Sequence, residues 1–208
     1  MSEILLTYYG HACFAAEYAG YRVVFDPYED GSVPGYRPLR LEAQQVLCSH
    51  AHHDHAFRSA VTLREGENPF RVEKIAVFHD DQKGALRGEN TIHILEAGGL
   101  RIAHFGDLGH PLSEEQIGLL GRLDAVMLPV GGYYTIDAQQ ASALADRLQA
   151  RIVLPMHARE GERGYDVLGT VEDFLALRSD VIRSAESTLR LTSELPRATV
   201  ALHPLAAE

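Results

Sequence analysis

Four side chains that could bind a metal lie within one short segment. Residues 49–55 read Ser-His-Ala-His-His-Asp-His, in which His50, His52, Asp54 and His55 fit the spacing His-x-His-x-Asp-His. Imidazole and carboxylate groups are the ligands that zinc and similar divalent ions take in catalytic sites. Packing them this densely without a cation would be electrostatically unfavourable, so the segment predicts a catalytic metal site.

The residues before this segment place it at the end of a strand. Gln45 to Ser49 form a short apolar run that is typical of a buried strand, so the histidines fall where a loop begins. Ligands collect at such strand ends in layered α/β folds. The alternatives are a solvated polar loop and a surface histidine patch that binds metal adventitiously, and the strand context favours a metal site over both.

The pattern along the chain predicts alternating strands and helices. Short runs rich in aromatic and β-branched residues predict strands over 4–9, 13–18, 21–25, 46–49, 74–78, 91–95, 100–105, 125–128, 152–154, 187–193 and 199–203. Polar caps followed by helical patterns predict helices over 113–121, 137–149 and 170–177. This order suits two sheets sandwiched by helices, and an ordinary three-layer α/β fold stays open.

The 50–55 segment resembles the signature of the metallo-β-lactamase superfamily. Further segments extend the resemblance along nearly the whole chain, and these are 9–14, 23–27, 104–110, 128–132 and 153–157. They look like the branch of small metal-dependent hydrolases that includes ascorbate-6-phosphate lactonase and N-acylphosphatidylethanolamine-hydrolysing phospholipase D. The resemblance implies a four-layer αββα sandwich of two mixed sheets with outer helices, and a two-metal site at one edge.

The resemblance also implies a set of seven metal ligands. These are His50, His52, Asp54, His55, His79, Asp107 and His157. His50 and His52 would bind one ion together with His79, and Asp54 and His55 would bind the second together with His157. Asp107 would bridge both ions, and the two distal histidines are chosen by their positions. His79 ends an apolar strand and His157 follows a buried strand, so either side chain could enter a site at a sheet edge. A plain surface histidine in a turn is the alternative at His79.

Such a pair of ions would generate its own nucleophile. Two cations roughly 3.5–4 Å apart share a water and lower its pKa to about 7, which makes a metal-bridged hydroxide available at neutral pH. One ion can polarise the carbonyl or phosphoryl oxygen of a substrate, while Asp54 holds the other ion and orients the attacking water. Zinc is the default ion, and the carboxylates also allow manganese or iron.

Histidines outside the ligand set have other expected roles. His110 follows Asp107 by three residues, so we expect it to line the substrate pocket or to act as a proton donor. His11 could orient a ligand from behind or be an ordinary turn histidine. His104 lies inside an expected strand, where a hydrogen-bonded core role or a role behind the ligands is favoured over direct ligation.

Several further residues could support or line the site. Asp26 could accept an imidazole N–H behind the ligands, or simply end a strand. Arg87 is expected to form a structural ion pair more readily than to clamp a phosphate. Tyr133 or Tyr134 could contact substrate. The pocket walls are expected to come from residues 28–40, 56–72 and 158–168, whose composition is too generic to name a ligand.

Length and composition predict one domain over residues 1–208. The chain is 46% hydrophobic, and no linker or charge run divides it. No apolar run approaches the roughly 18 residues of a membrane span, and the first residues lack the pattern of a signal peptide, so we expect a cytoplasmic protein. Cys13 and Cys48 lie in apolar runs and are expected to be free core thiols.

The formal net charge of −10, with no cluster of Lys and Arg, disfavours nucleic acid as a partner. We therefore expect a metal-dependent hydrolase that cleaves an ester, lactone or phosphoester bond of a small substrate, which could be anionic. The oligomeric state is left open. The alternatives are a catalytically silent metal-binding or sensing protein of the same fold, and redox chemistry at a di-iron centre.

Overall fold

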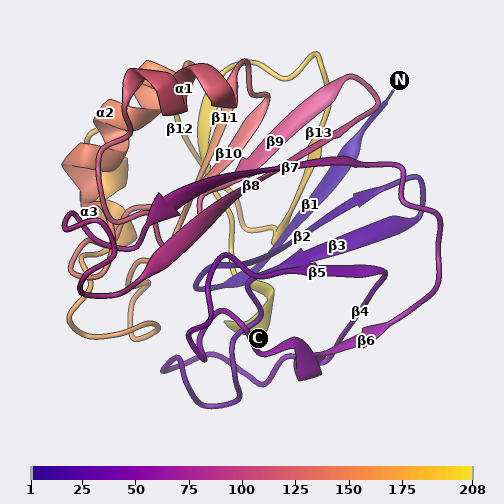
Figure 1. Cartoon of the computed structure of the whole chain (residues 1–208), viewed down its shortest axis with the longest axis horizontal. Helices are drawn as coiled ribbons and strands as arrows, with labels where there is room; N and C mark the ends of the chain where they lie inside the picture. Colours follow the sequence, from indigo (N-terminus) through magenta and orange to yellow (C-terminus); the bar gives the residue numbers. More distant parts are fainter. Residues whose placement is uncertain (1, 208) are drawn as a thin grey trace.

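The computed structural model describes residues 2–207, in which two large sheets and one small sheet account for the strands (Figure 1). The strands are β1 (Ile4–Gly10), β2 (Cys13–Tyr18), β3 (Tyr21–Phe25), β4 (Leu41–Ala43), β5 (Gln45–Leu47), β6 (Val61–Leu63), β7 (Arg71–Phe78), β8 (Glu89–Ala97), β9 (Leu100–His104), β10 (Ala125–Pro129), β11 (Ile152–Met156), β12 (Val181–Arg183), β13 (Thr188–Leu191) and β14 (Ala198–Ala201). The helices are α1 (Glu114–Leu120), α2 (Ala138–Leu148) and α3 (Val171–Leu175), with 3₁₀ turns η1 (Arg58–Ala60) and η2 (Leu205–Ala207).

Both large sheets are mixed. One has the order β13-β1-β2-β3-β5 and the other the order β12-β14-β11-β10-β9-β8-β7, while β4 and β6 pair by themselves. In the first sheet β1, β3 and β5 run in one direction, because β2 is antiparallel to β1 and to β3 and because β3 is parallel to β5. In the second, β7, β9, β10 and β11 share a direction. The carboxyl ends of these strands therefore gather at one edge of each sheet.

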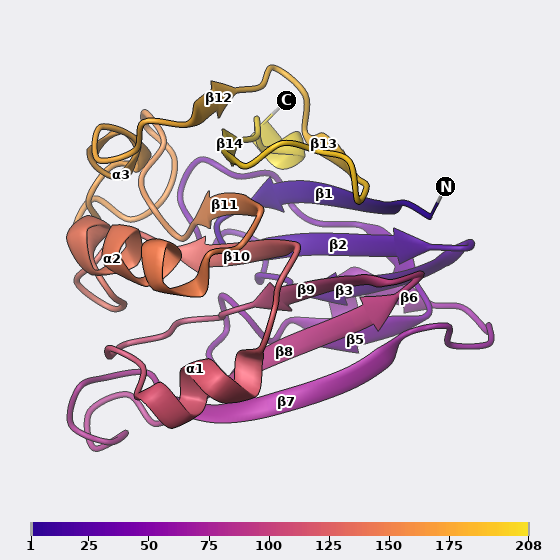
Figure 2. The same cartoon turned by 90° about the horizontal axis from the view of Figure 1, so that it is seen from above.

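The two edges meet. His157 follows β11 in the larger sheet, and its backbone N–H donates to the carbonyl oxygen of His11, which follows β1 in the smaller sheet, at 2.8 Å. The two sheets face each other across an apolar layer (Figure 2). Phe14, Leu95 and Ile102 belong to this layer and are at most 1% exposed. The packed sheets thus hold the loops from both edges against one another.

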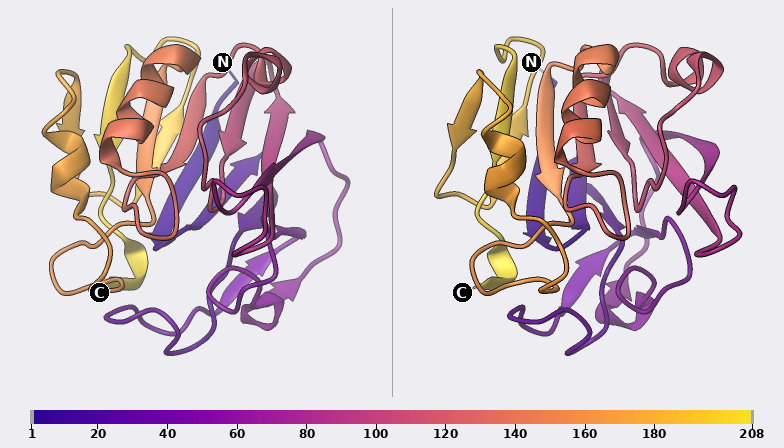
Figure 3. Two further views of the ribbon diagram at one scale, coloured as in Figure 1. Left: turned by 60° about the vertical axis from the view of Figure 1, so that its left-hand side comes forward. Right: turned by 90° about the vertical axis from the view of Figure 1, so that its left-hand side faces the viewer.

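The three α-helices pack on the outer face of the larger sheet (Figure 3). Each begins with the predicted cap, Ser113, Asp137 or Thr170, and each cap forms a reciprocal capping box with the residue three positions later. The stripe predicted for α2 is buried, and its members are Ala141, Leu144, Ala145 and Leu148. The longest helix in residues 2–207 has 11 residues, which is too short to cross a bilayer.

The predicted α/β sandwich of two mixed sheets is confirmed. The smaller sheet, however, is covered by loops and short elements. Its outer face packs against segment 28–40, η1 and the β4–β6 pair, so the described residues place no α-helix there. Tyr28 and Val33 of that segment are buried in this layer. Both cysteines belong to the same layer and are free thiols, as predicted.

Candidate metal centre

The seven predicted ligands all come from loops at the shared edge. Four lie in the loop after β5, and one follows each of β7, β9 and β11. Because the carboxyl ends of these strands lie together, residues far apart in the sequence become neighbours. Five residues thus reach one another from both sheets, and these are His50, His55, His79, Asp107 and His157.

Asp107 lies at the centre of this arrangement. Its Oδ2 atom is 3.1 Å from Nε2 of His157, 3.2 Å from Nε2 of His79, 3.3 Å from Nε2 of His55 and 4.0 Å from Nε2 of His50. The side chain of Asp107 is 3% exposed. One carboxylate oxygen therefore faces four imidazoles from three segments, which is the position that a bridging ligand needs.

The side chains form two neighbouring groups, and within each group the possible ligand atoms lie within 4.8 Å of one another. One group comprises His50, His52 and His79, and the other comprises His11, Asp54, His55 and His157. These groups match the two triads that the sequence resemblance implies, with His11 as an addition to the second. The ring of His11 also lies 4.2 Å from that of His157, centroid to centroid.

The donor atoms at the centre fit a divalent cation. Nε2 of His50, Nε2 of His55 and Oδ1 of Asp107 are buried, and none has a hydrogen-bond partner among residues 2–207. A buried polar atom without a partner is costly and normally marks an absent water or ion. Imidazole nitrogens together with carboxylate oxygens suit zinc, manganese or iron. The residues therefore fit the metal that their spacing predicts.

Hydrogen bonds behind the site fix which ring nitrogen faces it. Asp26 is fully buried, and its Oδ2 lies 2.9 Å from Nδ1 of His55. The Ser49 backbone N–H donates to Oδ1 of Asp26 at 2.7 Å, and the Ser49 hydroxyl donates to Oδ2 at 2.6 Å. That hydroxyl lies 2.9 Å from Nδ1 of His50 and can accept its proton. Both histidines therefore present an Nε2 lone pair to the centre.

The surroundings hold His50 and Asp107 in the forms that bind metal. Burial, and then the neighbouring His55, lower the pKa of His50 to about 3, so that its ring is neutral at physiological pH. Burial raises the pKa of Asp107, but His157 and His55 outweigh it and hold that pKa well below the usual range. Burial lowers the pKa of His55, but Asp107 and Asp26 outweigh burial and hold that pKa well above its usual range. A bound cation would replace the proton that His55 carries as a result.

Three residues at the site adopt left-handed backbone conformations. The φ angles are 56° at His11, 44° at Asp26 and 51° at His157. Non-glycine residues in this region carry strain of about 1–3 kcal/mol, and such residues concentrate at functional sites. All three lie directly after a strand, so the chain turns sharply there and directs each side chain into the shared edge.

We expect Gly106→Ala to destabilise the protein by about 3 kcal/mol or more. Gly106 has φ +53°, and a Cβ there would lie 2.3 Å from Cβ of Ser49 and 2.4 Å from Oδ1 of Asn90. Strain and overpacking each cost about 1–3 kcal/mol. Urea unfolding measures the loss. Gly118→Ala, where the Cβ meets open space within α1, is the control and should be neutral or stabilising.

An open cavity of about 380 Å³ adjoins the centre. It is lined by Ser32, His52, His53, Asp54, His79, Arg87, Asp107, Tyr134, His157 and Tyr165. Ser32 and Tyr165 come from two of the three predicted wall segments, and Tyr134 is the tyrosine of the predicted pair that lines it. The hydroxyl of Tyr165 donates to Oδ2 of Asp54 at 3.3 Å, a contact that no local sequence pattern predicts.

The structure contradicts the predicted role of His110. Its Nε2 accepts the Phe78 backbone N–H at 3.2 Å, and its Nδ1 lies 2.9 Å from the carbonyl oxygen of Pro111. Its ring faces a separate cavity next to α2. The reason is the close approach of Gly109 to the backbone of His79, which turns the chain away from the centre after Asp107.

Two further expectations need correction. None of the residues that line the cavity at the centre comes from 56–72, because η1 and β6 hold that segment against the smaller sheet. Arg87 was expected to form an ion pair, yet within residues 2–207 its guanidinium has no acidic partner and lies instead over the ring of Tyr134, 5.4 Å from the centroid. His104 is buried and contacts the Ala12 carbonyl oxygen at 2.8 Å, in agreement with a core role.

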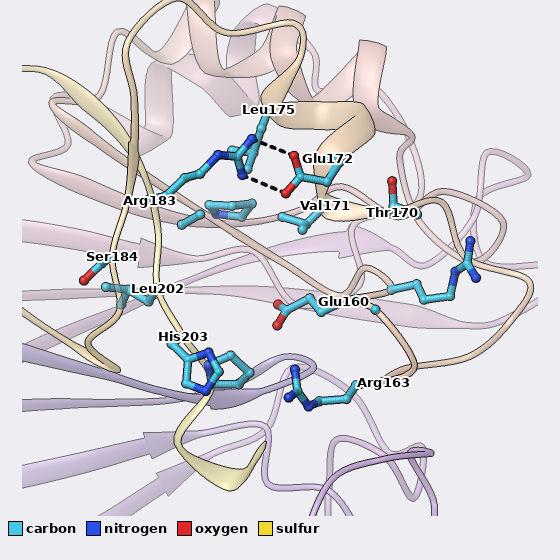
Figure 4. Close-up of a pocket in the computed structure, with 15 residues that line it drawn as sticks. Glu160, Arg163, Thr170, Val171, Glu172, Leu175, Arg183, Ser184, Leu202 and His203 are labelled. Carbon is cyan, nitrogen blue, oxygen red and sulfur yellow. Dashed lines mark hydrogen bonds and ion pairs between the residues drawn. The ribbon is translucent and has the colours of Figure 1, made fainter. Parts of the chain in front are cut away.

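A second cavity, of about 510 Å³, lies beside α3 and β14 (Figure 4). The carboxylate of Glu160 points into it, and Arg163 and His203 border the same space. The hydroxyl of Tyr8 donates to Oε1 of Glu160 at 2.8 Å and lies 3.3 Å from the carbonyl oxygen of His11. Tyr8 therefore connects the wall of this cavity to the loop that contacts Asp54.

We expect Glu160 to make stability depend on pH. Burial raises its pKa from 4.5 to about 7, against the opposing hydrogen bond from Tyr8. A raised folded-state pKa contributes stability that is complete below pH 4.5 and is lost as pH rises through 7, roughly 2–3 kcal/mol in all. Urea unfolding of the chelator-treated protein at pH 5 and pH 8 should show this loss, and Glu160→Gln should remove it. The exposed Glu162→Gln is the matched control, and an unchanged pH dependence in Glu160→Gln would refute the assignment.

Comparisons with known proteins agree with the geometry. Residues 5–157 match the family model described as the beta-lactamase superfamily domain. A protein of Thermoplasma acidophilum named as a metal-dependent hydrolase is 27% identical, over 76% of this chain and 84% of the relative. A Nanoarchaeum equitans protein with the same description is 29% identical, over 73% of this chain and 82% of the relative.

Solved structures resemble the whole fold. The structure of a Thermotoga maritima protein, described as a candidate zinc-dependent hydrolase of the metallo-β-lactamase superfamily, is 31% identical with a TM-score of 0.75, and it covers 96% of this chain and 98% of that one. A metallo hydrolase of Ignicoccus hospitalis, 20% identical with a TM-score of 0.66, covers 92% and 100% and shows the fold alone. With its histidine-rich loop, its two mixed sheets and a family match over residues 5–157, this chain belongs to the metallo-β-lactamase superfamily.

Proposed function

We propose that this protein is a metal-dependent hydrolase that cleaves an ester, lactone or phosphoester bond of a small substrate, with two divalent ions as cofactors and zinc as the default. The observation that supports it best is the position of Asp107 between imidazoles of both groups, beside buried nitrogens that have no hydrogen-bond partner among residues 2–207. The relatives named as metal-dependent hydrolases support the same class.

The ligands divide into two triads around Asp107. The first triad, His50, His52 and His79, would hold one ion. The second triad, Asp54, His55 and His157, would hold the other. His11 is assigned as a positioning residue rather than a ligand, because its Nε2 is 3.2 Å from Oδ2 of Asp54 and can donate to it. When bound, such ions supply Lewis acidity and lower the pKa of a coordinated water.

The protein's own groups orient and shield the reaction. His11 and Tyr165 both contact Oδ2 of Asp54, so this oxygen is held in place and Oδ1 of the same carboxylate can orient water. Burial and the charge of Asp54 raise the pKa of Tyr165, which therefore remains a hydrogen-bond donor at neutral pH. The cavity beside Asp54 and Asp107 leaves room for a small substrate. An enclosed site would instead favour a catalytically silent metal-binding protein.

Metal analysis combined with a substrate screen tests the proposal. We expect purified protein to carry about two divalent ions and to hydrolyse at least one of a panel of esters, lactones and phosphodiesters. Asp54→Ala should lose at least about 10²-fold in kcat/KM while its circular dichroism is unchanged. A parent-like rate in Asp54→Ala, or metal binding without turnover of any substrate, would argue against hydrolysis and for the silent alternative.

A further inference from the structure

One cation on the cavity wall has no assigned role. Arg87 is half-buried and is the only Lys or Arg among the residues that line the cavity at the centre. In the described part of the chain its guanidinium contacts the face of Tyr134 and no carboxylate. Stacking on an aromatic face leaves the charge of a guanidinium uncompensated and leaves its in-plane N–H groups free. Arg87 therefore offers an unused site for an anion.

The loop that carries Arg87 is rigidly built. Asp80 is 2% exposed, and its carboxylate accepts four backbone N–H groups of this loop at 2.8–3.0 Å, the last of them from Arg87 itself. The backbone N–H of His79 also donates to the carbonyl oxygen of Gly88 at 3.0 Å, which closes the loop at its base. Segment 80–88 is thus fixed to the strand end that supplies a proposed metal ligand, and an anchor held in this way loses little entropy on binding.

Tyr134 sets the position of Arg87 relative to both ligand groups. The backbone carbonyl of Tyr134 lies 3.1 Å from Nδ1 of His79 and fixes the orientation of that ring. The side chain of Tyr134 packs against the ring of Tyr165, 6.0 Å between centroids, and Tyr165 holds Asp54. The guanidinium and the proposed metal ligands therefore belong to one connected set of contacts around the cavity.

We propose that Arg87 binds an oxyanion of the substrate, a carboxylate or a phosphate group, at the wall of the cavity, where its guanidinium has no acidic partner among residues 2–207. The inference rests on the proposed hydrolase function and narrows its substrate class to small anionic molecules. Arginine forms a planar fork that matches both carboxylate and phosphate oxygens in a bidentate manner. A guanidinium held over Tyr134 presents that fork to whatever enters the cavity.

Calorimetric titration of the metal-loaded protein tests the proposal without requiring turnover. The probes are inorganic phosphate, succinate and the neutral metal-binding compound acetohydroxamate. We expect Arg87→Gln to weaken the binding of phosphate or succinate at least tenfold and to leave acetohydroxamate binding unchanged. If phosphate loses affinity, Arg87 binds a phosphate group of the substrate, and if succinate loses affinity, it binds a carboxylate. Arg87→Lys should restore part of the affinity, because it keeps the charge but not the fork.

Lys83→Gln is the matched control, because it removes the same charge from the same loop at an exposed residue outside the cavity. It should leave all three affinities unchanged. The inference is overturned if neither anion binds the parent protein, or if Arg87→Gln binds both as tightly as the parent does. Failure of acetohydroxamate to bind the parent would instead contradict an accessible metal site, and thus the proposed function itself.

Discussion

Asp107→Asn will leave the protein folded but will remove most of its metal and lower kcat/KM by at least about 10³-fold. The substitution keeps the size of the side chain and removes its negative charge. Asp107 Oδ2 lies within 3.3 Å of Nε2 atoms from three histidines, so that a single atom serves both ligand groups. An amide at this position cannot balance the charge of the two divalent cations that we propose.

Elemental analysis after dialysis against a known concentration of zinc or manganese measures the first effect, and initial rates on the best substrate of the screen measure the second. The matched control is Asp166→Asn, which removes the same charge from an exposed residue outside the cavity. If Asp107→Asn retains two ions with parent-like affinity, Asp107 does not bridge them and the proposed ligand set is wrong.

Asp26→Asn will reduce both the stability of the metal-free protein and its affinity for metal. The carboxylate of Asp26 is fully buried and serves the backbone N–H and hydroxyl of Ser49 and Nδ1 of His55. An Asn side chain would direct N–H groups at one of these donors. Breaking a buried charged network typically costs about 3–5 kcal/mol, and loss of a residue that orients a metal ligand costs about 10–100-fold in metal affinity.

The substitution to Asn separates the effect of losing the carboxylate from the effect of backbone strain. Asp26 has φ 44°, a left-handed conformation that Asn tolerates almost as well as Asp, so that the loss reports on the carboxylate. Urea unfolding in the presence of a chelator gives the stability, and competition with a chromophoric chelator gives the metal affinity. Ser49→Ala, which removes the hydroxyl between Asp26 and His50, should produce a smaller effect of the same kind. Parent-like values for Asp26→Asn in both measurements would contradict the orienting role.

Local patterns in the sequence determined the elements and the centre of the site. Strands over 13–18 and 21–25 and the caps of all three helices follow from side-chain alternation and from residues such as Asp137, which bond to the backbone nearby. The histidine-rich loop after β5 is local in the same sense. The short strands β4, β6 and β12 went unpredicted, because each has three residues of which at most one is buried, which leaves no apolar pattern to recognise.

The family resemblance pointed to the distant ligands, but the physical reason that they reach that loop lies in the tertiary structure. His79, Asp107 and His157 reach it because β7, β9 and β11 run in one direction and end at one edge, which strand pairing determines. His110 lies three residues from Asp107 and faces a different cavity, because both of its ring nitrogens contact backbone groups nearby. The residue types and their spacing in one loop thus determined the chemistry of the centre. The support from Asp26, the contact from Tyr165 and the free charge of Arg87 depended on long-range packing, which no local pattern in the sequence records.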